Sequence, residues 1–309
     1  MLGSWEVRQH FTFYVLRFTP YSLSVNPYEQ FVATLAKIHR DARGLPLGAF
    51  PMPAHLPPSV NAPRALIFSP HPDDEVIIGA LPLRLLRELN WRVVNVAVTQ
   101  GSNPARQAER WQELTACCAH IGFGLVQSAP GGLDDINLAA RDVDRAAWGR
   151  SVARIADILR EHQPRAIFLP HDDDWNVTHI GTHHLVVDAL KSLGPRFECL
   201  AVETEFWGAM RSPNLMVESS ERDLVDLLIA LSFHAGEVRR NPYHVRMPAW
   251  LIDNVRRGSE LVGGQGGPAP DFQFATLYRL RRWRGGQFED VFQGGKFLGV
   301  GESPSTLFS

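Results

Sequence analysis

Short apolar runs alternate with segments of helical periodicity through the middle of the chain. The runs are typical of buried strands, and they occupy residues 65–69, 93–99, 123–127, 165–170 and 197–206. Apolar side chains at helical spacing fill the intervals, at residues 75–89, 106–121, 144–161 and 179–192. Strands separated by helices of this length predict a mostly parallel sheet flanked by helices. The expected fold is therefore α/β and Rossmann-like, in a single catalytic domain.

The two ends of the chain depart from this alternation. Residues 45–58 are rich in proline, which suits neither helix nor sheet and indicates a semi-rigid lead-in. We therefore predict an N-terminal extension at residues 1–62 and the catalytic domain at residues 63–309. Beyond the alternating part, the pattern predicts two helices and a strand, at residues 221–238, 248–261 and 272–283.

Two local features refine these elements. Pro82 predicts a kink within the helix of residues 75–89. Residues 278–284 alternate basic side chains with aromatic or aliphatic ones, a pattern typical of an edge strand with a charged outer face.

Composition and charge narrow the class of protein. The 309 residues carry 31 basic and 33 acidic side chains, a formal net charge of −2, so no overall field favours nucleic acid or an anionic membrane. The three cysteines form no CxxC pair and no disulfide framework, and we expect a cytoplasmic, reducing location. Residues 11–23 are interrupted by Arg17 and Pro20 and are not expected to be a signal peptide. No apolar run approaches the roughly 20 residues of a membrane span.

The first candidate site follows the first predicted strand, in the sequence Pro70-His71-Pro72-Asp73-Asp74-Glu75. Ligands in parallel α/β sheets bind at the carboxyl ends of strands. A histidine and a carboxylate three residues apart, His71 and Asp74, can reach one cation at such a turn. The neighbouring Asp73 must then point away from the cation, so we expect its carboxylate to stand beside the metal and not to bind it. Helix capping would account for the acidic residues but gives no reason for a histidine between two prolines.

The second candidate site follows the strand of residues 165–170. Residues 171–184 contain four histidines and three aspartates, more than a solvated loop requires. His179 and His183 are four residues apart and lie on one face of a helix. Together with the first cluster, this segment completes a mixed nitrogen and oxygen site. Such sites usually hold zinc, and other divalent metals such as iron, cobalt, nickel or manganese fit as well.

These motifs resemble those of the PIG-L/LmbE-like deacetylases. The sequence PHPDDE is similar to the family's AHPDDE signature, and it is followed by matches to the T-x-G turn at residues 99–101 and the RxxELxxA helix at residues 110–116. LPHDDDWNVTH resembles the family's D-x-HPDH block, and the later segment that carries His234 resembles its closing part. The resemblance covers residues 64–240.

The resemblance implies a role for each matching residue. His71, Asp74 and His179 would be the zinc ligands, one ion per chain, with Asp73 as general base. Arg110 matches an arginine that contacts substrate in the family. We also expect Asp174 and His183 to contact the substrate or to orient a ligand.

One position departs from the family pattern. Where the family reads HPDH, this chain has Asn176-Val-Thr-His179, so Asn176 replaces a histidine that stabilises the oxyanion or protonates the leaving amine. Asn176 can donate a hydrogen bond but cannot deliver a proton. We predict that His234 supplies the proton; His171, His183, His184 and Asp73 itself are the alternatives.

The resemblance implies a zinc-dependent hydrolase that removes an N-acetyl group from an N-acetylglucosaminyl conjugate. The metal would lower the pKa of its water to about 7, and Asp73 would take the proton. Two alternatives stay open at this point, a non-haem iron(II) oxygenase with the same triad and a non-catalytic metal-binding protein. The expected partners are a small amino-sugar conjugate and, in a homo-oligomer, further copies of the chain.

Overall fold

The computed structural model describes residues 26–308, which fall into two compact units that divide after Gly44. In the first unit, helix α1 (Pro27–Ala42) begins at Asn26, whose side chain accepts a hydrogen bond from the Tyr28 amide. One face of α1 is apolar. The predicted boundary between residues 62 and 63 stays a prediction, and residues 11–23 lie outside the described part.

The second unit contains nine further α-helices among its described residues, with two short 3₁₀ helices and nine strands. The α-helices are α2 (Asp74–Ile77), α3 (Leu81–Glu88), α4 (Pro104–Ile121), α5 (Leu138–Val143), α6 (Arg145–His162), α7 (Val177–Ser192), α8 (Glu221–Ser232), α9 (Ala235–Arg240) and α10 (Met247–Leu261). The 3₁₀ helices are η1 (Tyr243–Val245) and η2 (Pro304–Leu307). The strands are β1 (Arg64–Ser69), β2 (Arg92–Ala97), β3 (Gly124–Gln127), β4 (Ala166–Pro170), β5 (Cys199–Thr204), β6 (Leu215–Glu218), β7 (Ala275–Arg284), β8 (Gln287–Asp290) and β9 (Lys296–Leu298). Across residues 26–308, no helix combines the length and hydropathy that crossing a bilayer requires.

The strands form one sheet in the order β3-β2-β1-β4-β5-β7-β6-β9, with β8 paired to β7. The first five strands of this order are parallel, and β7 runs antiparallel to β5. The chain order reverses between β1 and β4, which makes the carboxyl ends of these two strands the switch point where such folds bind ligands. The predicted fold class, a mostly parallel sheet flanked by helices, is confirmed.

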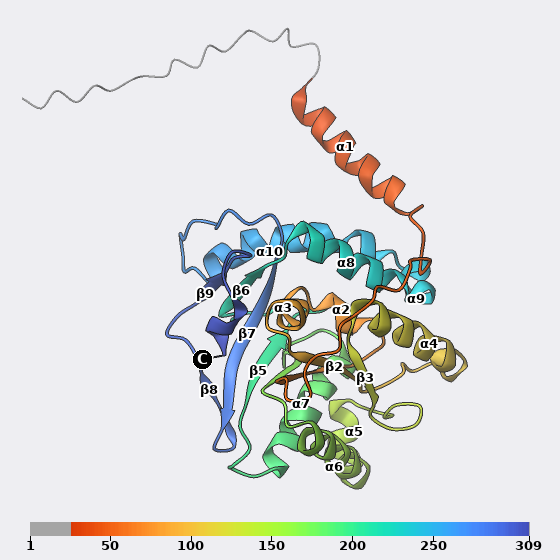
Figure 1. Ribbon diagram of the computed structural model, residues 1–309, viewed down its shortest axis with the longest axis vertical. Coiled ribbons are helices and arrows are strands. Elements are labelled where there is room, and N and C mark those ends of the chain that lie inside the picture. The colour runs from red at the N-terminus through yellow and green to blue at the C-terminus, as the bar shows by residue number, and fades with distance from the viewer. Residues whose placement is uncertain (1–25, 309) are drawn as a thin grey trace, which may run out of the picture. The chain divides into compact units, whose positions relative to one another are not determined.

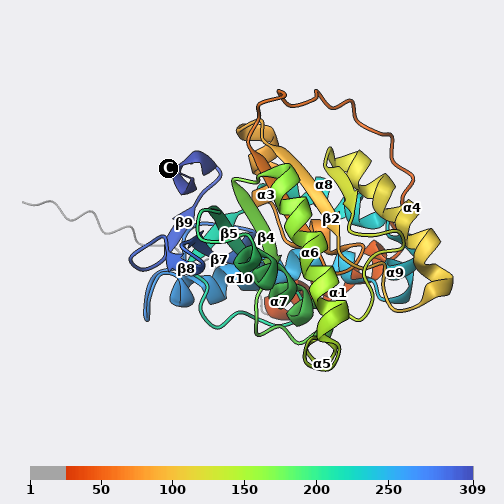
Figure 2. The same cartoon turned by 90° about the horizontal axis from the view of Figure 1, so that it is seen from below.

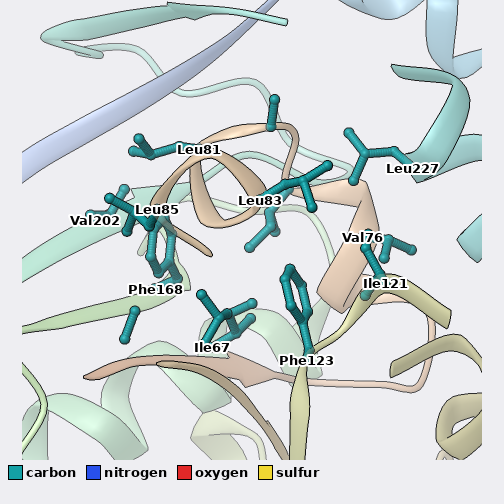
Figure 3. Packing of buried hydrophobic residues seen from close by; sticks show 14 of the residues in the cluster. Ile67, Val76, Leu81, Leu83, Leu85, Ile121, Phe123, Phe168, Val202 and Leu227 are labelled. Carbon is teal, nitrogen blue, oxygen red and sulfur yellow. The ribbon is translucent and has the colours of Figure 1, made fainter. Parts of the chain in front are cut away.

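Helices cover both faces of the sheet, α8 and α10 on one side and α6 and α7 on the other (Figures 1 and 2). The strands are apolar in consecutive positions because alternate side chains enter two separate cores. From β1, Ile67 packs into the core beneath α2, α3, α4 and α8, whereas Leu66 and Phe68 face α6 and α7. Figure 3 shows the first of these cores, where Ile67 lies with Phe123 and Phe168 against the leucines of α3. The packed sheet fixes both loops at the switch point.

Three predicted elements differ in the structure. The helix predicted at 75–89 is two helices, α2 and α3, separated at Gly79, whose φ of 86° is left-handed. Pro82 therefore does not kink a helix but lies in the first turn of α3, where its missing N–H is tolerated. The helix predicted at 221–238 is likewise divided into α8 and α9, with His234 at the division.

The third difference is β7, which is not an edge strand. It lies between β5 and the pair β6 and β8. Two of its four basic side chains are neutralised within the sheet, since Arg279 and Arg281 both donate hydrogen bonds to the buried carboxylate of Glu203 on β5. Cross-strand charge pairing, which the pattern along one strand does not reveal, explains these arginines.

Candidate metal centre and active-site pocket

The turn between β1 and α2 presents its polar side chains through a strained backbone. Asp73 has a φ of 110°, a left-handed conformation that is rare for residues other than glycine. Its amide donates a hydrogen bond to Glu75 Oε2 over 2.9 Å, and the His71 amide donates to Asp74 Oδ2 over 2.9 Å. These two bonds hold the carboxylates of Glu75 and Asp74 against the backbone of the turn.

Three donor atoms converge at the switch point. His71 Nδ1 lies 3.2 Å from His179 Nε2, and Asp74 Oδ2 lies 3.5 Å from His71 Nδ1 and 3.4 Å from His179 Nε2. Tetrahedral zinc with bonds of about 2.0–2.1 Å places its donor atoms about 3.3 Å apart. The spacing and the donor set of two imidazoles and one carboxylate therefore fit a divalent cation.

The protonation states of Asp74 and His179 also suit binding of a cation. Burial lowers the pKa of His179, and metal ligation requires a neutral imidazole. Burial alone would raise the pKa of Asp74, but the charge of His179 and hydrogen bonds from His71 outweigh it and lower the pKa below its usual 3.8. Asp74 is thus anionic and His179 neutral near pH 7.

A buried carboxylate and an aromatic ring surround His179. Asp174 Oδ1 lies 3.8 Å from His179 Nδ1, beyond hydrogen-bond distance but close enough to favour the proton on that nitrogen. The ring of Phe206 packs edge-on against the imidazole at 4.7 Å. Asp174 is held in turn by the amides of Asn176 and Gly208. A side chain at Gly208 would meet Asp174 Cα at 2.8 Å, so the two loops approach too closely for any other residue.

Asp73 lies beside the triad and outside it. The Tyr243 hydroxyl donates a hydrogen bond to Asp73 Oδ2 over 2.5 Å, and Arg110 Nη2 lies 3.9 Å from Asp73 Oδ1. Burial raises the pKa of Asp73, the Asp74 carboxylate raises it further, and the value is about 7. A pKa near neutrality is what a group that both accepts and returns a proton requires.

These groups open into a polar pocket of about 460 Å³. Its lining residues come from the loops after β1, β2, β4 and β5 and from α4 and α9. They are His71, Asp73, Asp74, Gln100, Gly101, Ser102, Asn103, Arg106, Arg110, Trp175, Asn176, Trp207, Glu237, Arg240 and Asn241. We refer to this cavity as the polar pocket. It has the size of a small-molecule site.

Several residues predicted from the sequence line the polar pocket, namely His71, Asp73, Asp74, Arg110 and Asn176. Arg110 donates to the Pro72 carbonyl over 2.8 Å and so also supports the turn that carries Asp73. Asn176 is the N-cap of α7, its Oδ1 accepting from the Thr178 amide over 2.8 Å. With Oδ1 engaged in this way, the amide nitrogen is the group that Asn176 can offer to a ligand.

The structure does not bring the predicted proton donor, His234, or the predicted substrate contacts His183 and Asp174 to the polar pocket. His234 is fully buried, and its Nε2 bonds Glu75 Oε1 over 2.7 Å behind Asp73. His183 Nδ1 bonds the Pro170 carbonyl over 2.9 Å, and Asp174 lies behind His179. A substrate in the pocket meets none of these three side chains, because each is enclosed by the loops that it supports.

Sequence reasoning missed two features of the site. Tyr243 is 170 positions from Asp73, and no local motif marks it. Glu237 was also missed, although it joins three arginines, accepting a hydrogen bond from Arg106, pairing with Arg240 and lying 3.8 Å from Arg110. The charged side chains of α9 can be read from the sequence. Their partners on α4 lie more than a hundred residues away along the chain, so the pairing could not be predicted.

Comparison with known proteins agrees with this geometry. Residues 66–190 match the PIG-L family model, described as GlcNAc-PI de-N-acetylase. The matched segment contains the donor triad and Asp73, and the predicted resemblance to the PIG-L/LmbE-like family is confirmed. No curated protein sequence matches the chain.

Solved structures share the fold at low sequence identity. N,N′-diacetylchitobiose deacetylase from Pyrococcus horikoshii is 16% identical with a TM-score of 0.53, over 85% of this chain and 95% of its own. The A40926 pseudoaglycone deacetylase Dbv21 is 16% identical with a TM-score of 0.51, over 73% and 99%. GalB, the 4-carboxy-2-hydroxymuconate hydratase from Pseudomonas putida KT2440, is 17% identical with a TM-score of 0.50, over 71% and 95%. These similarities establish the fold, and the hydratase among them illustrates that the site must decide the reaction.

Proposed function

We propose that this protein is a metal-dependent N-deacetylase that acts on an N-acetylated amino-sugar conjugate. The observation that carries the proposal is the arrangement of four side chains, three of which, His71, Asp73 and Asp74, line one pocket with His179 directly behind them. Three donor atoms lie 3.2–3.5 Å apart, and the free carboxylate of Asp73 lies beside them. A structural metal site does not require a carboxylate that stands beside the metal without binding it. Amide hydrolysis, in contrast, needs a base next to the metal.

His71, Asp74 and His179 would hold the metal, which we propose to be zinc on the basis of its mixed nitrogen and oxygen donors. A bound divalent cation supplies Lewis acidity, which polarises the acyl oxygen and makes water a stronger acid. Three protein ligands leave a coordination position for substrate or water. The chain's own residues carry the remaining steps.

Asp73 removes the proton from the attacking water, and Tyr243 holds the carboxylate in place for that transfer. The amide nitrogen of Asn176 is suited to donate a hydrogen bond to the oxyanion, because Asn176 lines the polar pocket and stands at the positive end of α7. An asparagine can thus replace the family's histidine in stabilising charge.

The leaving amine still needs a proton. Among the described residues that line the polar pocket, the only histidine is the ligand His71. We therefore assign the return of the proton to Asp73, which acts first as base and then as acid. Its pKa of about 7 suits both directions of transfer.

The polar pocket suits the sugar part of the substrate. Arg106, Arg110 and Glu237 offer charged hydrogen-bonding groups, and the exposed ring of Trp207 offers a face on which a sugar can stack. The oxygenase alternative has no comparable support, since its triad belongs to a β-sandwich and leaves Asp73 without a role.

The test is acetate release by zinc-loaded protein from a panel of N-acetylglucosaminyl conjugates. We expect release by the parent and a loss of at least about a hundredfold in Asp73→Asn, the contribution of a general base. Asp173→Asn is the matched control, since its side chain is half-exposed, pairs with Arg211 and does not line the pocket. Absence of release, with zinc bound, would favour the metal-binding protein without catalysis.

A further inference from the structure

A second cavity, of about 350 Å³, adjoins the polar pocket. It is lined by Ile77, Phe206, Trp207, Leu231, Asn241, Tyr243, Arg246, Met247 and Trp250. We refer to it as the apolar pocket. Trp207 and Asn241 line both cavities, so the two meet there. Of the lining residues, only Ile77 lies within the segment that matches the family model.

Two walls of the apolar pocket touch the reacting groups. Phe206 packs against the imidazole of the predicted ligand His179, with ring centroids 4.7 Å apart. Tyr243 bonds the carboxylate of Asp73 over 2.5 Å. Phe206 and Tyr243 therefore stand between the apolar pocket and the reacting groups, since neither the triad nor Asp73 lines this cavity. A group that enters the apolar pocket past Trp207 and Asn241, where the two cavities meet, lies one side chain away from the triad and the base.

The size of the apolar pocket exceeds what an acetyl group needs. The methyl group of acetyl is about as large as a water molecule, whose share of liquid volume is about 30 Å³. The cavity is about ten times larger. Its walls are aromatic and aliphatic, with Arg246 as the one charged lining residue among those described. Such a cavity favours an alkyl chain or an aryl group.

We propose that the apolar pocket is the acyl subsite, and that the preferred substrate carries an N-acyl group larger than acetyl. This inference rests on the proposed amide hydrolysis. In that reaction the oxygen of water bonds to the acyl carbon, the carbon–nitrogen bond breaks, and the proton passes through Asp73 to the amine. The products are a fatty or aromatic carboxylic acid and a free amino sugar, which remains in the polar pocket.

The experiment compares two substrate series. One varies the acyl chain of methyl glucosaminide from acetyl to octanoyl, and the other keeps N-acetyl and varies the glycoside from methyl to octyl. We expect kcat/KM to rise about fourfold for each added acyl methylene until the cavity is filled, from the transfer free energy of a methylene group. The glycoside series should change little. A rise in the glycoside series alone, or in neither series, would overturn the acyl assignment.

Variants on α10 locate the effect. Trp250 lines the apolar pocket, and Ile252, two positions along the same helix, is exposed and lines neither cavity. Trp250→Ala should lower kcat/KM for the hexanoyl substrate about tenfold and leave the acetyl substrate within about twofold. Trp250→Leu should retain part of the preference, and Ile252→Ala all of it. Equal losses on both substrates in Trp250→Ala would contradict the proposal.

Binding separates this inference from the proposed reaction. Titration calorimetry of the same acyl series, with chelator-treated wild type and chelator-treated Trp250→Ala, measures occupation of the apolar pocket without turnover. Affinity that grows with acyl length only in wild type, with no amine released by the zinc-loaded protein, would support the apolar site and reject hydrolysis. Amine release from the acetyl substrate without any dependence on acyl length would support hydrolysis and reject the acyl subsite.

Discussion

The hydroxyl of Tyr243 donates a hydrogen bond to Oδ2 of Asp73 over 2.5 Å. Burial raises the pKa of Tyr243, and the negative charge of Asp73 raises it further, so the phenol stays protonated and remains a donor. The bond fixes one carboxylate oxygen of Asp73, the proposed base. Tyr243 is therefore a positioning residue for proton transfer as well as a wall of the apolar pocket.

Tyr243→Phe tests this role. Loss of one hydrogen bond to a charged group, worth about 1.5–3 kcal/mol, should lower kcat about ten- to a hundredfold. KM for the acetyl substrate should stay within about twofold, because the ring and its apolar contacts remain. Steady-state kinetics on the acetyl substrate measure both. An unchanged kcat would show that Asp73 needs no such support, and Tyr28→Phe, on α1, controls for loss of a phenol in general.

Substitutions of two predicted ligands, Asp74 and His179, and of Asp73 should separate metal binding from catalysis. Because a ligand that binds only the folded state stabilises it by about 2.7 kcal/mol at a hundred times its Kd, zinc should raise the melting temperature of the chelator-treated protein. Asp74→Asn and His179→Ala should abolish that rise together with activity. Asp73→Asn should keep the rise and lose the activity. Calorimetric melting with and without zinc checks each variant, and loss of the zinc effect in Asp73→Asn would mean that Asp73 is itself a ligand.

The buried pair of His234 and Glu75 gives a pH-dependent contribution to stability. Burial would lower the pKa of His234, but the charge of Glu75 and their hydrogen bond outweigh it and raise the pKa above 6.5. The folded protein thus binds a proton that the unfolded chain releases above about pH 6.5. Its contribution is complete below that pH and is lost as the pH rises through the folded pKa.

His234→Gln should therefore be less stable than wild type by about 2 kcal/mol at pH 6, and the difference should narrow towards pH 9. Urea unfolding at a series of pH values measures this. Glu75→Gln provides the matched control, since without the carboxylate the His234 substitution should lose its pH dependence. A difference that widens with pH would mean that the ring is neutral in the folded protein.

The apolar pattern predicted the sheet and the meeting of the two candidate loops for the same reason, whereas the choice of His179 as the third ligand came from the family resemblance. Continuous apolar runs mark strands buried on both faces, and parallel strands bring the residues after β1 and β4 to one edge. His71, Asp74 and His179 therefore meet as expected. Contacts made by the later part of the chain carry no such periodicity. That is why Tyr243 was missed, and why His234 was expected in the pocket although its ring lies buried behind Asp73.

A substitution at Gly208 tests how closely the loops after β4 and β5 must approach each other. Its carbonyl accepts a hydrogen bond from His171 over 2.9 Å, and its missing side chain leaves room for Asp174 and Trp175. Gly208→Ala should push this loop outward and lower kcat/KM about tenfold or more, since small misplacements of reacting groups are costly. Gly149→Ala is the matched control, because a side chain there meets nothing within 4 Å and the position is inside α6. The control should stabilise the protein by about 0.5–1 kcal/mol and keep full activity. Equal activity in both variants would show that the loop adjusts without disturbing His179.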